Sequence, residues 1–188
     1  MLRFQALSPA LLNDYLAFFD HDAFADNPEW AGCYCACFHV PTAEEWDRAT
    51  PEENRGRICH LVQDGTHEGW LAYDGERPVG FCLAAPRAAL PFARLRMGLP
   101  RDEAAGVGVL LCFVVAAGHR RQGVARGLLN AACEGFAARG LRLVEAYAKP
   151  EAEGDAAHFQ GPPQMYLDAG FSEIGRFGGR IVLQKTLR

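Results

Sequence analysis

The residues best suited to chemistry form a short basic run between Gly118 and Arg126, which reads GHRRQGVAR. Gly123 is expected where a turn enters a helix, because backbone N–H groups there lack partners and the helix dipole adds partial positive charge. Several such N–H groups can share a pyrophosphate, and Arg121 and Arg126 can add charge-assisted contacts. Since Gly123 has no side chain and Ala125 has a small one, the backbone stays open to approach. The run therefore predicts a diphosphate cradle.

This spacing differs from the two common phosphate-binding loops. It is neither G-x-x-x-x-G-K-[ST] nor G-x-G-x-x-G, so nucleoside triphosphates and nicotinamide cofactors are poorly supported. Taken alone, the pattern Arg-x-x-Gly-x-Ala is also what a plain helix start with exposed arginines would contain. The elements around the run must decide between these two interpretations.

Three elements around the run are expected to form a β-α-β unit. Val109–Val115 is a continuous apolar run of strand length, as in a strand buried on both faces. After Gly123 a helical pattern continues to a stop at Gly140, with an apolar ridge of Val124, Leu128, Ala132 and Phe136. Leu141–Tyr147 is the next strand, and the two strands should be parallel or nearly so.

The rest of the chain predicts a mixed sheet with further helices, which is an α/β fold class. Helices are expected over Ser8–Phe19, with Ser8 as its cap, over Pro51–Val62 and over Pro162–Ala169. Hairpins are expected at Trp70–Tyr73 with Val79–Leu83 and at Ser172–Phe177 with Arg180–Thr186, and an irregular excursion at Arg87–Glu103. At 188 residues the chain fits one domain.

Val115 to Leu129, placed after a buried strand, resembles the acetyl-coenzyme A motif of the GNAT superfamily of N-acetyltransferases. The segment Tyr166-Leu-Asp-Ala-Gly-Phe171, one strand later, resembles that superfamily's tyrosine-bearing helix. The resemblance covers about residues 70–188 and fits the N-terminal part more loosely. A remoter similarity, to bacterial members with a Gly-Cys-aromatic-Cys segment, rests on Gly32–Cys35.

The resemblance implies a mixed, centrally splayed β-sheet of about six to seven strands flanked by helices, in a single domain over residues 1–188. The pantetheine arm of acetyl-coenzyme A would enter between the splayed strands, and no metal is expected. The backbone of Phe113, Val114 and Val115 would bind that arm. The pyrophosphate would be held by Arg120, Arg121, Gln122, Gly123, Val124, Ala125 and Arg126.

Amine acetylation needs a neutral amine and expels a thiolate that benefits from a proton, so one base and one acid are wanted. Tyr166 matches the superfamily's acid, although an ordinary half-buried tyrosine is the alternative. Glu145 is the candidate base because it stands amid apolar neighbours, with a solvent-facing glutamate and a water relay as alternatives. The asparagine common in the superfamily between this strand and the tyrosine helix is missing.

Two other clusters invite a function. The acidic loop with Glu151, Glu153 and Asp155 could cover a cationic substrate, but a solvated loop explains it better. On a strand, Cys33, Cys35, Cys37 and His39 would share a face, but zinc sites favour C-x₂-C spacing, so a metal is disfavoured. A covalent route through Cys112 is disfavoured because a thiol in an apolar strand is poorly nucleophilic. His119 and His158 receive no catalytic role.

Composition restricts the partners. The net charge of −4 argues against nucleic acid and against an anionic membrane surface. Residues 1–93 hold 14 acidic and 6 basic residues, and residues 94–188 hold 9 and 13, so an anionic cofactor suits the second half. Seven cysteines at irregular spacing imply no disulfide framework. No secretory signal or membrane span is recognised, which predicts a cytoplasmic protein.

The function expected from these observations is an acetyl-coenzyme A-dependent N-acetyltransferase, in which a bound primary amine attacks the thioester directly. The acceptor would be a small-molecule amine or a peptide amine, and its identity and the acyl-chain length stay open. A homodimer is one of the open oligomeric states. The alternative function is a noncatalytic acyl-coenzyme A-binding sensor that keeps the cradle without productive acid–base chemistry.

Overall fold

The computed structural model describes residues 1–90, 92–96, 105–151 and 158–187, and its centre is a seven-stranded sheet in the order β1-β2-β3-β4-β5-β7-β6. The strands are β1 (Leu2–Ala6), β2 (Gly69–Asp74), β3 (Arg77–Pro86), β4 (Val107–Val115), β5 (Leu143–Ala148), β6 (Ser172–Phe177) and β7 (Arg180–Thr186). The predicted mixed sheet and both hairpins are confirmed. Only β1 was not predicted, although its five residues LRFQA alternate between apolar and polar types; the strand is short and lies at the sheet edge, where none of the five is fully buried.

The central pair of strands is parallel and all other neighbouring pairs are antiparallel. Helix α5 (Val124–Ala138) connects β4 to β5, which confirms the predicted β-α-β unit. The predicted ridge of α5 is buried, and β4 is buried over eight of its nine residues. At Gly127 the helix lies against the ring of Phe4 on β1, so closely that a Cβ atom would collide with it.

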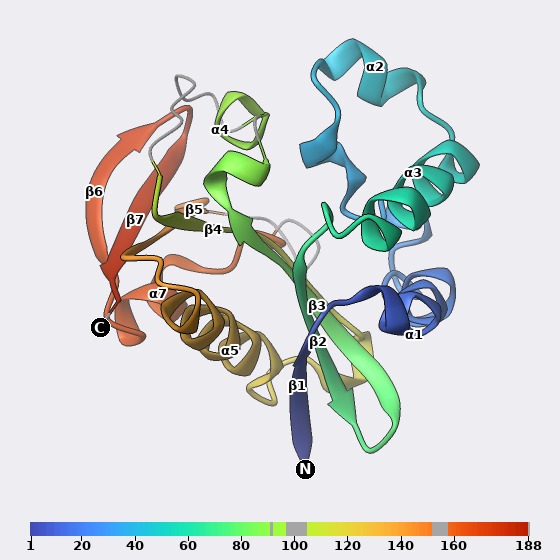
Figure 1. The fold of residues 1–188 in the computed structure, drawn as a ribbon, viewed down its shortest axis with the longest axis horizontal. Helices are drawn as coiled ribbons and strands as arrows, with labels where there is room; N and C mark the ends of the chain where they lie inside the picture. Colours follow the sequence, from blue (N-terminus) through green and yellow to red (C-terminus); the bar gives the residue numbers. More distant parts are fainter. Residues whose placement is uncertain (91, 97–104, 152–157, 188) are drawn as a thin grey trace.

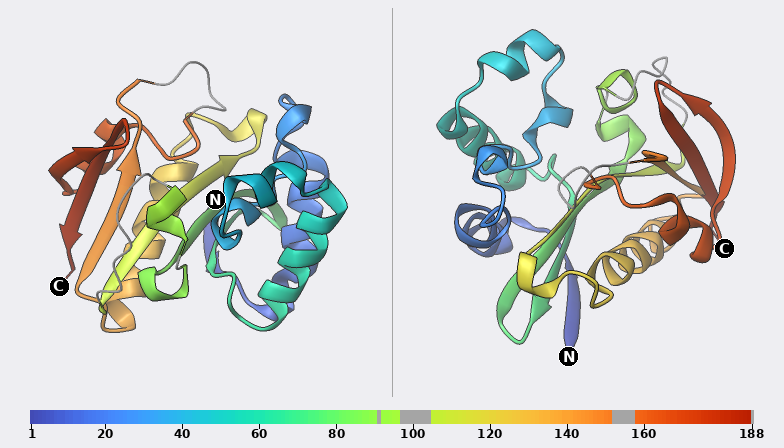
Figure 2. Two further views of the ribbon diagram at one scale, coloured as in Figure 1. Left: turned by 90° about the horizontal axis from the view of Figure 1, so that it is seen from above. Right: turned by 180° about the vertical axis from the view of Figure 1, so that it is seen from behind.

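Helices cover both faces of this sheet (Figures 1 and 2). One face packs against α5 and α7 (Pro163–Asp168). The other packs against α1 (Leu12–Ala17), α3 (Pro51–Gln63) and the turns between them, with Tyr15, Phe18, Phe19 and Ile58 in its core. The second face therefore owes its cover to the first third of the chain. No helix of the described residues is long and apolar enough to span a membrane.

The N-terminal helices differ in detail from prediction. The segment predicted as one helix from Ser8 to Phe19 consists of a 3₁₀ turn (Pro9–Leu11), α1, and a wider helical turn (Phe18–Asp22), and the Ser8 side chain makes no cap bond. Helix α3 begins with a capping box between Thr50 and Glu53. Helix α2 (Ala43–Arg48) was not predicted, and α4 (Ala93–Arg96) and a 3₁₀ turn (Arg87–Ala89) lie within the predicted irregular excursion.

The two central strands separate along their length. Strand β5 pairs with β4 only over Val107–Leu110, whereas β3 stays paired with β4 to Val115. Beyond Leu110 the β5 side of β4 faces the chain that follows β5, and the Phe113 N–H donates to the Phe159 carbonyl at 2.6 Å. The sheet is therefore open at its centre, next to the N-terminus of α5.

Candidate active site

A cavity of 1290 Å³ lies at this opening and extends from the start of α5 to the N-terminal helices. Its first wall contains Cys112, Phe113, Val114, Val115, His119, Arg120, Arg121, Gly123, Val124, Ala125 and Arg126. Its second wall comes from residues 23–54, with aromatic, acidic and thiol side chains. The chain after β5 adds His158, Phe159, Gly161, Pro162, Met165 and Asp168. One continuous space thus joins the predicted cradle to a part of the chain for which sequence assigned no site.

The backbone at the start of α5 has the form predicted for an anion cradle. Gly123 precedes the helix with φ +83°, a left-handed conformation that suits glycine, and no side chain caps the helix within the described residues. The Gly127 N–H already donates to the Gly123 carbonyl at 2.9 Å, so the N–H groups available for an anion are those before it. A Cβ at Gly123 would have only the Arg126 guanidinium near it among the described residues, at 4.0 Å, so the space in front of this backbone is open. These features fit a diphosphate.

Among the predicted pyrophosphate-binding residues, the side chains differ in where they lie. Arg120 donates to the Val115 carbonyl at 3.2 Å and pairs with Asp26 at 2.5 and 2.9 Å, so it bridges the two walls of the cavity. This guanidinium lowers the pKa of Asp26 by hydrogen bonding. Arg121, with φ +60°, and Arg126 both line the cavity.

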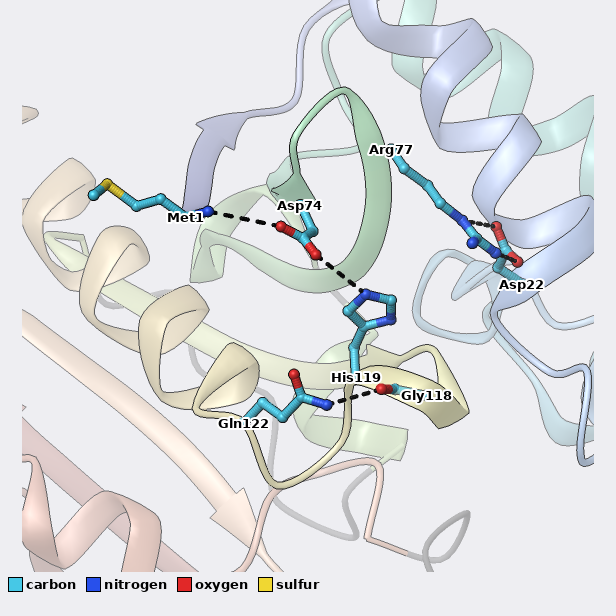
Figure 3. Close-up of polar contacts among 7 residues, drawn as sticks. All are labelled: Met1, Asp22, Asp74, Arg77, Gly118, His119 and Gln122. Carbon is cyan, nitrogen blue, oxygen red and sulfur yellow. Dashed lines mark hydrogen bonds and ion pairs between the residues drawn. The ribbon is translucent and has the colours of Figure 1, made fainter.

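Gln122 is turned away from the cavity. Its amide donates to the Gly118 carbonyl at 2.8 Å, and it is absent from the described lining (Figure 3). In the same view His119 lies 3.6 Å from Asp74, which belongs to the turn end of β2. Both contacts hold the loop that precedes α5, and the cofactor-binding role of Gln122 stays a prediction.

Tyr166 lies on α7 and is fully buried beside the opening between the strands. Its ring contacts those of Phe113 and Phe171, and its hydroxyl donates to the Gln160 carbonyl at 2.6 Å. Burial raises the pKa of Tyr166, so the phenol stays protonated at neutral pH. To donate to a group in the cavity, the hydroxyl must first break its hydrogen bond to the Gln160 carbonyl.

Glu145 lies apart from the cavity lining, on the other side of β5 from α5. Its carboxylate is 2% exposed and accepts from Arg87 at 2.6 Å and from Arg94 at 2.8 and 3.1 Å. Both arginines come from the chain between β3 and β4, for which sequence assigned no structure. Both contacts are charge-assisted and hold the carboxylate apart from the cavity lining. The geometry therefore favours a structural ion pair, and the base role of Glu145 stays a prediction.

The cysteine-rich segment is not a strand, which corrects the premise of the metal hypothesis. Tyr34 and Cys35 have positive φ, and Ala36–His39 is a 3₁₀ turn, so the alternate residues do not share a face. Cys35 Sγ lies 3.3 Å from Cys112 Sγ on β4, while His39 turns toward His67. In the described ranges no group of three His, Cys, Asp or Glu side chains is arranged to hold a metal ion.

Cys33 and Cys37 remain on the wall of the cavity. A hydrogen bond from Cys37 lowers the pKa of the Cys33 thiol, against the opposing effect of burial. Of the acidic loop, for which a solvated loop was preferred to a cover over the substrate, Glu153 and Asp155 lie outside the described residues. His158 lines the cavity.

Sequence reasoning missed the N-terminal wall. Trp30, Trp46 and Asn54 line the cavity, and Trp30 contacts the Phe159 ring at a centroid distance of 5.9 Å. These residues come from three short elements that no shared motif connects. The available signal was the two tryptophans in polar, weakly periodic segments, where a large aromatic side chain needs a partner.

An open-centred mixed sheet with an anion cradle at the following helix defines a class of coenzyme A-dependent transferases. The sequence model of the Acetyltransferase (GNAT) family matches residues 18–159. The chain therefore belongs to the GNAT family of acetyltransferases, which take the acetyl group from acetyl-coenzyme A. No curated protein matches the chain in sequence.

Solved structures of GNAT acetyltransferases share the fold. A GNAT-family acetyltransferase from Streptococcus pneumoniae matches with 16% identity, full coverage of both chains and a TM-score of 0.57. The PaiA N-acetyltransferase from Thermoplasma acidophilum, in complex with coenzyme A, matches with 13% identity, 99% coverage of each chain and a TM-score of 0.59. A ribosomal-protein-alanine N-acetyltransferase from Brucella melitensis matches with 19% identity, 100% and 99% coverage, and a TM-score of 0.54.

Proposed function

We propose that this protein transfers an acetyl group from acetyl-coenzyme A to a primary amine, by direct attack while both substrates are bound, and that residues 1–188 act as one catalytic domain. The observation that carries the proposal is the single cavity that connects the α5 cradle to the N-terminal wall. A sensor would need only the cradle, whereas this cavity has room for a second molecule. The names of the N-acetyltransferases from T. acidophilum and B. melitensis support an amine acceptor.

The residues of the first wall divide the work of binding the co-substrate. The free N–H groups at the start of α5, with Arg121 and Arg126, would hold the pyrophosphate, and the open side of β4 from Phe113 to Val115 would bind the pantetheine arm. The co-substrate supplies the acetyl thioester. Because the Phe113 N–H is bonded to Phe159, the chain after β5 would have to yield that donor when the arm binds.

Proton transfer is assigned to Tyr166 and to water. Tyr166 is protonated at neutral pH and lies next to Phe113, which suits it to donate toward the departing thiolate. For the amine proton we propose a water chain rather than Glu145, because that carboxylate is held by two arginines away from the cavity. A water route was one of the alternatives open at the level of sequence.

Release of free thiol from acetyl-coenzyme A, measured across a panel of small amines and peptides, tests the proposal. Turnover that depends on one class of amine, with formation of its N-acetyl product, is expected. Tight binding of acetyl-coenzyme A without turnover for every acceptor would contradict it and favour the noncatalytic sensor. Gly123→Val, which adds a branched side chain at a residue with φ +83°, serves as the control for binding at the predicted site.

A further inference from the structure

The N-terminal wall of the cavity carries features that select an acceptor. From them we infer that the acceptor is a primary amine with an aromatic or branched apolar body and no carboxylate group, and that Asn54 binds its amino group. This inference rests on the proposed function and concerns the second substrate of the same site. Three independent observations carry it: an unsatisfied acceptor atom, an aromatic lining and an uneven distribution of charge.

Asn54 supplies the unsatisfied atom. It lies on α3, is 3% exposed and belongs to the cavity lining. Its Nδ2 donates to the Gly32 carbonyl at 3.0 Å, which fixes the orientation of the amide. Its Oδ1 is buried and has no hydrogen-bond partner among the described residues. Leaving such an acceptor unpaired costs about 1–3 kcal/mol, so an N–H donor from a ligand would be favourable there.

The lining around Asn54 is aromatic. Residues of the first third of the chain contribute Phe24, Trp30, Tyr34, Phe38 and Trp46 to this wall. Trp30 and Trp46 are half-buried, and Phe38 is almost fully buried. Aromatic rings of this number stabilise an apolar body by burial and by ring stacking, and give little to a short polar chain.

Charge on the cavity wall is divided between its two ends. The lining residues described between 23 and 54 include Glu29 and Asp47, and none of them is Lys, Arg or His. The basic lining residues belong to the other parts of the wall, and they are His119, Arg120, Arg121, Arg126 and His158. Of these, Arg120 extends across to pair with Asp26 of the N-terminal segment. The N-terminal wall itself therefore favours an ammonium group. A carboxylate beside the amine would face Glu29 and Asp47, and the arginine that reaches this side, Arg120, is already paired with Asp26.

Three acceptors that share one ring and one amino group test the selection. We expect 2-phenylethylamine to be acetylated with a kcat/KM about a hundredfold above that of L-phenylalanine. The kcat/KM of L-phenylalanine methyl ester should lie within about tenfold of that of 2-phenylethylamine. The ester matches the amino acid in bulk but lacks the charge. Ethylamine, which keeps the amine and lacks the ring, should have a KM at least about tenfold higher than 2-phenylethylamine.

Variants of Asn54 test the anchor. Asn54→Leu removes the acceptor at similar size and should raise the KM for 2-phenylethylamine about tenfold while the KM for acetyl-coenzyme A stays the same. Asn54→Asp keeps an acceptor oxygen but loses the donor to the Gly32 carbonyl, so it should bind the amine more tightly than Asn54→Leu. Thr50→Ala removes the capping box of the same helix and is the structural control, since it should leave both KM values unchanged.

Binding gives a readout without turnover. Because Trp30 and Trp46 line the cavity, binding of 2-phenylethylamine should change the tryptophan fluorescence of the parent. The Kd from the same titration should be about tenfold higher for Asn54→Leu. L-phenylalanine turned over as well as its ester, or an Asn54→Leu variant with unchanged amine affinity, would overturn the inference while leaving the proposed function standing. Coenzyme A binding with no turnover of any of these amines or of peptides would instead overturn the proposed function.

Discussion

Tyr166 is the residue whose surroundings bear most directly on chemistry. Its hydroxyl donates to the Gln160 carbonyl at 2.6 Å, and burial keeps it protonated. Because the phenol next to the open edge of β4 is neutral, it still carries the proton that a general acid donates to the departing thiolate. The position thus suits an acid and is unsuited to a base.

Replacing Tyr166 by phenylalanine should lower kcat about a hundredfold, since a general acid contributes at least that much, with the KM for acetyl-coenzyme A within twofold of the parent. Steady-state kinetics at saturating amine measures both constants. Tyr73→Phe is the matched control. It removes a hydroxyl that donates to Asp14 at 2.8 Å, and Tyr73 is not among the described residues of the cavity lining. An unchanged kcat in Tyr166→Phe would remove this residue from the reaction.

Glu145→Gln separates an ion pair from a catalytic base. Because the carboxylate neutralises two buried guanidinium groups, its loss should lower the free energy of unfolding by about 3 kcal/mol and leave the pH–rate profile unchanged. Urea unfolding and the pH dependence of kcat/KM measure the two effects. Glu134→Gln, on the exposed side of α5, should change stability by less than about 0.5 kcal/mol. Loss of the acidic limb of the profile, where a catalytic base becomes protonated, would restore the base role.

At the scale of elements, α5 provides the cradle through its N-terminus and its packing. Its ridge fixes the helix on the sheet, and Gly127 allows close contact with β1, so the first turn is held rigidly beside the end of β4. Donors that are already oriented bind an anion without a reorganisation penalty.

Gly123→Ala tests this element. The substitution places a Cβ at φ +83°, which costs about 1–2 kcal/mol, and narrows the approach to the free N–H groups. The KM for acetyl-coenzyme A should rise about tenfold. Gly140→Ala is the control, because Gly140 has φ +78° at the other end of the same helix with open space around it. Gly140→Ala should show the same loss of stability in thermal unfolding, with no change in the KM for acetyl-coenzyme A. If its KM rose as much as that of Gly123→Ala, strain alone would account for the effect.

The elements that sequence predicted are those in which local pattern and burial agree. Strand β4 and helix α5 carry an unbroken apolar run and a regular ridge, and both are central in the structure. Helix α2 reads AEEWDR with one apolar side chain, and it forms because Thr42 caps it and Trp46 packs on the core. Strand β1 is defined by pairing with β2, sixty residues and more along the chain. Both elements have a local signal, the alternation LRFQA in β1 and Thr42 three residues before Glu45 at α2, but each is too short for that signal to decide without its tertiary partner.

At the scale of the whole molecule, the two halves of the site differ in how well they could be predicted from the sequence. The cradle lies within one short run, so its residue types and spacing could be interpreted together. The N-terminal wall gathers Trp30, Trp46 and Asn54 from separate elements, and only the packing of these elements on the sheet brings them to one cavity. The same holds for Arg87 and Arg94, whose partner Glu145 is more than fifty residues away.

A chain of buried polar groups holds the N-terminal helices to the sheet. His39 Nε2 lies 2.8 Å from His67 Nδ1, and His67 Nε2 lies 3.2 Å from the Tyr15 hydroxyl, which donates to the Tyr34 carbonyl at 2.8 Å. One arrangement of protons satisfies every bond: His39 donates to His67, and His67 donates to Tyr15. In that arrangement both imidazoles are neutral, and a proton added at His67 Nδ1 would break the bond to His39.

This chain predicts how the stability of the whole molecule depends on pH. Burial lowers the pKa of His39 to about 4, with Arg57 lowering it further and Asp64 opposing, and burial lowers that of His67 as well. Below pH 6.5 the unfolded chain binds protons that the folded chain refuses, so the free energy of unfolding must fall as pH drops from about 6.5 toward 4. For His39 alone the loss amounts to about 2 kcal/mol at pH 5.

Urea unfolding at pH 7.5 and pH 5.0 measures the effect on the protein, and His39→Gln should reduce the difference between the two values by about 2 kcal/mol because glutamine does not titrate. His60→Gln, on the exposed side of α3, should leave the difference as it is in the parent. Since the turn around His39 contributes Cys37 and Phe38 to the N-terminal wall, acid should weaken amine binding before it weakens binding at the α5 cradle. Equal pH dependence in His39→Gln and the parent would mean that other groups set the acid limit of the fold.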